Sequence, residues 1–126
     1  MEPERRFAVT RRGAFGQYAE DQAVAFLEAK GYKILARNYR VRAGEIDIVA
    51  LSGYRVVFVE VKARSDIAHG YPREAVTPLK QARVARAACA FLEERDLSDA
   101  PSRFDVIEVY GGRIVHWRNA FEAVDI

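Results

Sequence analysis

The stretch VVFVEVKAR, residues 56–64, is the feature that most constrains the fold of this chain. Its β-branched and apolar residues predict a buried strand, whose side chains alternate between two faces. Every second residue from Val57 to Ala63 then forms one apolar face, whereas Glu60 and Lys62 lie together on the other. Because a buried charge is costly unless it is paired or bound to a metal, the second face must be wet, ion-paired or a functional site.

Helical and strand patterns alternate along the rest of the chain. Gly31 is a good stop for the first helix, and Thr77 with Pro78 is typical of the start of the second, which we expect to reach about Arg95. The expected elements are a helix at 16–30, strands at 32–40, 45–51 and 55–64, the second helix, and strands at 103–110 and 113–118. This order, α-β-β-β-α-β-β, predicts an α/β fold with a mixed five-stranded sheet flanked by helices.

The composition limits the classes of protein that this chain can belong to. A length of 126 residues suits a single domain, and no apolar run approaches the ~20 residues that a membrane helix needs. A lone cysteine, Cys89, cannot form an intrachain disulfide, and we expect a cytoplasmic protein. Cys89 has small helical neighbours and is predicted to face the core, on one side of the second helix with Leu79.

Basic residues gather in two places. Arg11 and Arg12 belong to a basic extension at 1–12, a candidate for flexibility, that precedes a single domain at 13–126. The start of the second helix carries further candidates for contact with nucleic-acid phosphates, because free N–H groups at a helix N-terminus attract anions. These candidates are Lys80, Gln81, Arg83 and Arg86. The alternative is ordinary solvated surface, and a net charge of +2 permits an anionic partner without requiring one.

Acidic residues converge on the strand predicted at 55–64. Asp47, in GEIDIVAL, lies one hairpin away from Glu60, so the two carboxylates are expected to approach each other across the strands. Such a pair needs a cation or a shared proton, and carboxylate oxygens suit Mg²⁺ or Mn²⁺. Lys62 would orient the attacking water, and Glu20, bordering the apolar stripe of the first helix, would reach the metal through water. The pattern predicts hydrolysis of a phosphodiester, against the alternative of an exposed strand face with an ordinary Glu–Lys contact.

Glu45 is expected on the same strand face as Asp47. It is either a supporting acid of the site or the partner of an arginine such as Arg42.

The motifs GEIDIVA and VFVEVKAR resemble the YraN-type family of bacterial proteins, which is similar to archaeal Holliday-junction resolvases and to the restriction-endonuclease-like superfamily. The resemblance extends from about residue 13 to residue 121 through GQYAEDQAVAFLEAKGYKILARNYR, AVTPLKQARVARAACAFL and RFDVIEVY. It implies a restriction-endonuclease-like core. It places the catalytic acid of the superfamily at Asp47, the Glu-x-Lys pair at Glu60 and Lys62, and the helical acid at Glu20.

The expected function is therefore that of an endonuclease dependent on Mg²⁺ or Mn²⁺ that cuts DNA, with branched and damaged DNA as candidate substrates. A homodimer would suit a two-fold symmetric junction. Two alternatives stay open: a nucleic-acid-binding protein that keeps the fold without cutting, and an adaptor that binds another protein.

Overall fold

The computed structural model describes residues 11–64 and 76–122. Its elements are α1 (Arg11–Ala29), β1 (Lys33–Val41), β2 (Gly44–Ser52), β3 (Arg55–Ala63), α2 (Pro78–Glu94), β4 (Ser102–Tyr110) and β5 (Arg113–Phe121). The predicted order is confirmed, although α1 begins at Arg11, ahead of the expected 16. Most of the predicted basic extension and of the loop after β3 lies outside the described residues. None of the helices in these ranges is long and apolar enough to cross a membrane.

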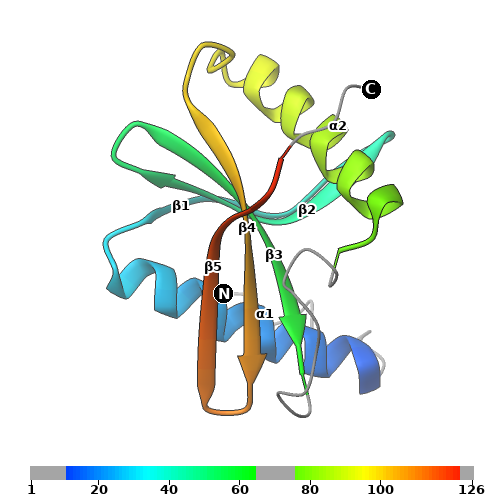
Figure 1. Cartoon of the computed structure of the whole chain (residues 1–126), viewed down its shortest axis with the longest axis vertical. Helices are drawn as coiled ribbons and strands as arrows, with labels where there is room; N and C mark the ends of the chain where they lie inside the picture. Colours follow the sequence, from blue (N-terminus) through cyan, green and yellow to red (C-terminus); the bar gives the residue numbers. More distant parts are fainter. Residues whose placement is uncertain (1–10, 65–75, 123–126) are drawn as a thin grey trace.

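The five strands form one sheet in the order β1-β2-β3-β4-β5. All neighbours are antiparallel except β3 and β4, which are parallel. A parallel pair needs a long crossover, and α2 lies in this connection. The helices α1 and α2 cover opposite faces of the sheet (Figure 1). The predicted mixed sheet with flanking helices is thus confirmed.

Each face of the sheet has its own hydrophobic core. Ala19, Ala23 and Leu27 of α1 pack on the face that carries Val57 and Val59. On the other face, α2 contributes Val84 and Phe91 to a core with aromatic residues of the last two strands, Phe104 and Phe121. The apolar face predicted for β3 is therefore the one beneath α1.

The helix α2 begins as the sequence predicts but turns a different face to the sheet. The Thr77 hydroxyl accepts a hydrogen bond from the Lys80 N–H at 3.2 Å. The buried residues of the helix are Val84, Ala85, Ala87, Ala88 and Phe91. Leu79 is 71% exposed and Cys89 is also exposed, so the core position predicted for Cys89 is wrong. Small residues lie on both sides of this helix, and the sequence pattern alone does not select between them.

Gly44 explains how closely α2 approaches the start of β2. A methyl group at this position would lie 1.8 Å from the Arg83 carbonyl oxygen, so only glycine fits without moving the backbone. This contact fixes the N-terminal half of α2 over the start of β2, near the predicted acidic residues.

Candidate functional site

The strands β2 and β3 separate at Asp47 and Glu60, and we call this place the fork. Main-chain pairing runs from Ser52 opposite Arg55 to Ile48 opposite Val59 and then stops. Beyond this point the hydrogen bonds between the two strands run from main-chain N–H groups to the carboxylates of Asp47 and Glu60. The Asp47 N–H donates to Glu60 Oε2 at 3.1 Å, and the Val61 N–H donates to Asp47 Oδ2 at 2.8 Å. The prediction that these two acids approach each other across the strands is confirmed.

The alternation of side chains along β2 is interrupted near Asp47, opposite Asn38 of the neighbouring strand. Asn38 of β1 has a left-handed backbone with φ of 50°, between the pairs that Arg37 and Tyr39 make with β2. Opposite it, the alternation of β2 is broken, because Ile46 and Val49 both belong to the core beneath α2. Asp47 consequently lines a hollow with Glu20 of α1, whereas the sequence placed it on the same face as Val49.

Glu20 reaches this hollow from α1 and is only 7% exposed, as expected for an acid that borders the apolar stripe. Its Oε1 accepts hydrogen bonds from Arg37 Nη2 at 2.9 Å and from Asn38 Nδ2 at 3.1 Å. Burial raises the pKa of the Glu20 carboxyl above its ordinary value, and Arg37 offsets part of that rise. Asp47 lies close enough to contribute to the same rise through charge repulsion.

Glu60 is the most deeply buried acid of the fork, with 2% of its surface exposed. Its cationic neighbour is Lys80 of α2, whose Nζ lies 3.6 Å from Glu60 Oε1 and 3.4 Å from Glu45 Oε2. Burial, followed by the charge of Asp47, raises the pKa of Glu60 to about 8. Burial likewise raises the pKa of Asp47. The fork therefore holds more buried carboxylate than its lysines neutralise.

The hollow between α1 and the fork has a volume of about 610 Å³. It contains two of the predicted acids, Glu20 and Asp47, and the predicted lysine, Lys62. Arg40 and Arg64 add positive charge to the same wall, and the remaining lining comes from Gly16, Gln17, Asn38, Val61 and Ala63. Charges of both signs thus meet in one open space of the size of a small-ligand site.

Glu60 does not belong to the lining of the hollow, and its free oxygen faces Lys80 instead. Across the described ranges, no three residues among His, Cys, Asp and Glu are grouped closely enough to enclose a metal ion. Asp47 Oδ1 and Glu20 Oε2 accept no hydrogen bond from any described residue. The fork therefore offers oxygen atoms for a cation but no closed protein shell around one.

The predicted phosphate-contacting residues do not all lie here. Lys80 reaches the fork, where it pairs with acids, and Gln81 Nε2 donates to the Val76 carbonyl oxygen at 2.8 Å. Arg83 and Arg86 are exposed on α2 and do not line the hollow. Arg11 and Arg12 lie in the first turn of α1, and their side chains are outside the description.

Glu45 pairs with Lys80 and, at 3.7 Å, with Arg40, so the arginine partner expected as one of two alternatives is Arg40 and not Arg42.

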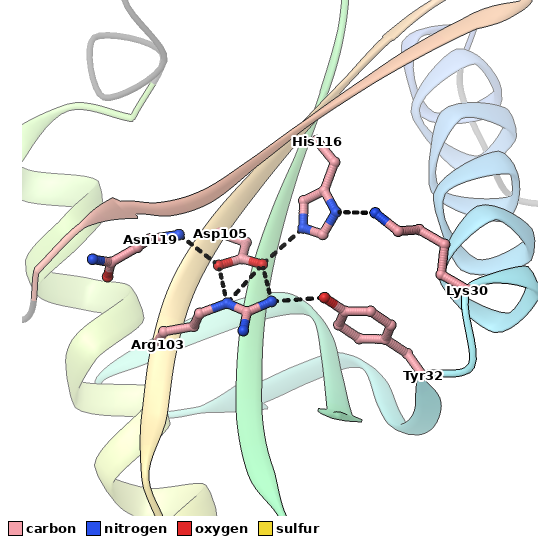
Figure 2. Close-up of polar contacts among 6 residues, drawn as sticks. All are labelled: Lys30, Tyr32, Arg103, Asp105, His116 and Asn119. Atoms are coloured by element: carbon pink, nitrogen blue, oxygen red, sulfur yellow. Dashed lines mark hydrogen bonds and ion pairs between the residues drawn. The ribbon is translucent and has the colours of Figure 1, made fainter. Parts of the chain in front are cut away.

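A second polar cluster lies on β4 and β5, centred on the fully buried Asp105 (Figure 2). Its Oδ2 lies 2.7 Å from His116 Nε2, and its Oδ1 accepts from Arg103 Nε at 2.9 Å and from the Asn119 N–H at 2.9 Å. Asn119 has a left-handed backbone where the pairing of β4 with β5 shifts register. These contacts give Asp105 and His116 a structural role, because they join β4 to β5.

Comparison with known proteins places the chain among relatives of the same length. The model of the uncharacterised protein family UPF0102 matches residues 19–109. A UPF0102 protein of Desulforapulum autotrophicum is 51% identical over 111 residues, which are 85% of this chain and 92% of that protein. One of Geobacter sulfurreducens is 46% identical over 112 residues, covering 85% of this chain and 88% of the relative. One of Clostridioides difficile is 46% identical over 108 residues, 84% and 95% of the two chains. This chain is therefore a member of the UPF0102 family, the family that the YraN-type motifs predicted.

Proposed function

We propose that this protein is an endonuclease that uses Mg²⁺ or Mn²⁺ to hydrolyse phosphodiesters of DNA at the fork. The observation that carries the proposal is the juxtaposition of Asp47 and Glu60 where β2 and β3 separate, with Lys62 following on β3. A buried carboxylate, Glu60, and a half-buried one, Asp47, both with raised pKa values, form a site that a divalent cation would stabilise.

The donor atoms at the fork suit such a cation. They are carboxylate oxygens, which Mg²⁺ and Mn²⁺ prefer, and Mg²⁺ is commonly held by one or two carboxylates with water completing the shell. Asp47 and Glu60 would hold the metal directly, and Glu20 would hold it through water. When bound, the metal would polarise the phosphodiester and lower the pKa of a water molecule.

The side chains of the fork then have distinct roles. The Asp47 carboxylate is oriented by the Val61 N–H, and the Glu60 carboxylate by the Asp47 N–H, so neither is free to rotate. Lys62 lines the hollow, where its ammonium group would orient the attacking water and offset negative charge that develops on the phosphate. Lys80 neutralises part of the charge of Glu60 and Glu45 from the side of α2.

A cleavage assay tests the proposal. Wild-type protein and the variants Asp47→Asn, Glu60→Gln and Lys62→Met are incubated with Mn²⁺ or Mg²⁺ and with single-stranded, duplex, flap and four-way-junction DNA. We expect metal-dependent cutting of at least one DNA, reduced by about 10²-fold or more in each variant. Asp99→Asn, a change at an exposed acid of the segment between α2 and β4, should cut like the wild-type protein.

A DNA-binding protein that does not cut is the second candidate. It is favoured by the position of Glu60, whose free oxygen faces Lys80 while the other acids line the hollow. Under this alternative the protein binds the same DNAs, the metal ions cause no cutting, and the three fork variants leave DNA affinity unchanged. That set of results would overturn the catalytic proposal.

A further inference from the structure

Glu108, a second buried acid of β4, binds the side chain of Arg64, which lines the hollow. Glu108 lies opposite Lys62 in the parallel pairing of β3 with β4 and is 4% exposed. Its Oε1 accepts hydrogen bonds from Trp117 Nε1 at 2.9 Å and from the Tyr110 hydroxyl at 3.1 Å. Its Oε2 accepts from Arg64 Nε at 3.1 Å. Three donors from three positions thus fix this carboxylate in one orientation.

These hydrogen bonds also keep Glu108 charged. Although burial opposes ionisation, the bonds from Trp117, Arg64 and Tyr110 lower the pKa of the Glu108 carboxyl below its ordinary value. A carboxylate that is oriented by three donors is well suited to hold a guanidinium group in place.

Among residues 11–64 and 76–122, the guanidinium group of Arg64 has a hydrogen-bond partner at Nε only. Its main-chain N–H donates to the Val109 carbonyl oxygen at 2.9 Å, which extends the ladder one residue beyond β3. Its Nε is used by Glu108, whereas neither terminal nitrogen donates a hydrogen bond to a residue within 11–64 or 76–122. The side chain is 21% exposed and lines the hollow beside Lys62.

The structural arginine of the same sheet shows the contrast. Arg103 donates through Nε and Nη2 to Asp105 and also through Nη2 to the Tyr32 hydroxyl at 2.7 Å, so two of its nitrogens are engaged by buried partners (Figure 2). Within the described part of the chain, Arg64 is instead oriented by a single bond at Nε, and its two terminal nitrogens donate to no described residue. The two terminal nitrogens of a guanidinium group match two oxygens of a phosphate group.

We infer that Arg64 binds a backbone phosphate of nucleic acid at the fork and that Glu108 positions it for this contact. The inference rests on the proposed function for the class of ligand, since a nucleic acid presents phosphates on either side of the bond that Lys62 would approach. Arg64 supplies affinity and register, because phosphate contacts position a nucleic acid without reading its bases. Trp117 and Tyr110 contribute by fixing Glu108.

The test is DNA binding as a function of salt, measured by fluorescence anisotropy in EDTA with a labelled four-way junction and a labelled duplex. Arg64→Gln should weaken binding roughly tenfold and reduce the slope of log K against log salt by about 0.9, the value for one lost phosphate contact. Arg64→Lys should keep the slope, because the charge remains, and lose part of the affinity. The matched control is Arg55→Gln, which removes an exposed arginine from the opposite end of β3 and should change neither quantity.

The positioning role of Glu108 is tested by a double-mutant cycle. Glu108→Gln should weaken DNA binding several-fold in the wild-type background and leave it unchanged in the Arg64→Gln background. An equal loss in both backgrounds would overturn the positioning role. A slope and affinity for Arg64→Gln equal to those of Arg55→Gln, or no binding of either DNA by the wild-type protein, would overturn the phosphate contact.

Cutting assays with Mn²⁺ separate this inference from the proposed function. An altered slope in Arg64→Gln without any cutting by the wild-type protein would support the phosphate contact and contradict the nuclease. Cutting by the wild-type protein together with an unaltered slope in Arg64→Gln would support the nuclease and contradict the phosphate contact.

Discussion

Two buried acids on neighbouring strands of this sheet have pKa values that are shifted in opposite directions. Asp105 on β4 is fully buried, and Glu60 on β3 is 2% exposed. Burial disfavours the charged form of both carboxyls. Nevertheless the hydrogen bonds from His116, Arg103 and Asn119 lower the pKa of Asp105, whereas the pKa of Glu60 rises to about 8.

The partners of each acid account for the difference. Asp105 receives a guanidinium group, an imidazole and a main-chain N–H, all within 3.2 Å. Glu60 receives one main-chain N–H and a lysine at 3.6 Å, and it lies beside a second carboxylate, Asp47. The cluster around Asp105 is complete without a ligand, whereas Glu60 needs more positive charge nearby than Lys80 and Lys62 supply to offset its burial and the charge of Asp47. A divalent cation would supply that charge, which is why we place the reaction at the fork and assign Asp105 to the framework.

The largest expected effect is on stability, from breaking the completed cluster. Asp105→Ala leaves Arg103 buried without its carboxylate and removes the acceptor of the Asn119 N–H. We expect a loss of about 3–5 kcal/mol in the free energy of unfolding, measured by urea denaturation. The control Asp99→Asn, at an exposed position, should stay within about 0.5 kcal/mol of the wild-type protein. A small loss in Asp105→Ala would mean that the cluster contributes little to the framework.

Glu60→Gln should have the opposite effect on stability. In metal-free wild-type protein the pKa of Glu60 is raised, so its neutral form stabilises the fold. This contribution to the free energy of unfolding is complete below pH 4.5, the ordinary pKa of glutamate, and is lost as the pH rises through about 8. The neutral glutamine removes this dependence. At pH 9 in EDTA the variant should therefore be more stable than the wild-type protein, by on the order of a few kcal/mol.

Urea denaturation between pH 5 and pH 9 measures this difference. A wild-type curve parallel to that of Glu60→Gln across the range would show that the Glu60 carboxyl titrates normally, and the comparison with Asp105 would fail.

Lys80→Met should produce the smallest of these changes. The Lys80 ammonium group offsets part of the charge of Glu60 and Glu45, but it is partly exposed and therefore screened by solvent. In EDTA at pH 9 we expect a loss of about 1 kcal/mol relative to the wild-type protein, and a smaller loss at pH 5, where Glu60 is neutral and Lys80 keeps only its pair with Glu45. A loss of equal size at both pH values would indicate a packing role for Lys80 instead of a charge role.

The sequence predicts the element order, the mixed sheet and the approach of Asp47 to Glu60, because these follow from local patterns and a short hairpin. It does not predict the side on which Asp47 lies. The alternation of β2 is interrupted between Ile46 and Val49, opposite the left-handed Asn38 of β1, and a strict period of two does not anticipate such an interruption.

The sequence pattern also does not predict which distant segments contact each other. Lys80 was expected at a phosphate and instead reaches Glu60, since the crossover between β3 and β4 brings the start of α2 over the fork. The bond from Arg64 to Glu108 joins residues 44 positions apart in the chain and depends on the same crossover. The glycine at 44, against the Arg83 carbonyl, is the one local signal of this close approach.

Direct titration of the protein with Mn²⁺, followed by the electron paramagnetic resonance signal of the free ion, tests the central claim that the fork is a cation site. Wild-type protein and Asp99→Asn should bind the ion alike, and Asp47→Asn and Glu60→Gln should each bind it at least about tenfold more weakly. Equal binding in all four proteins, or none in the wild-type protein, would contradict a metal site at Asp47 and Glu60.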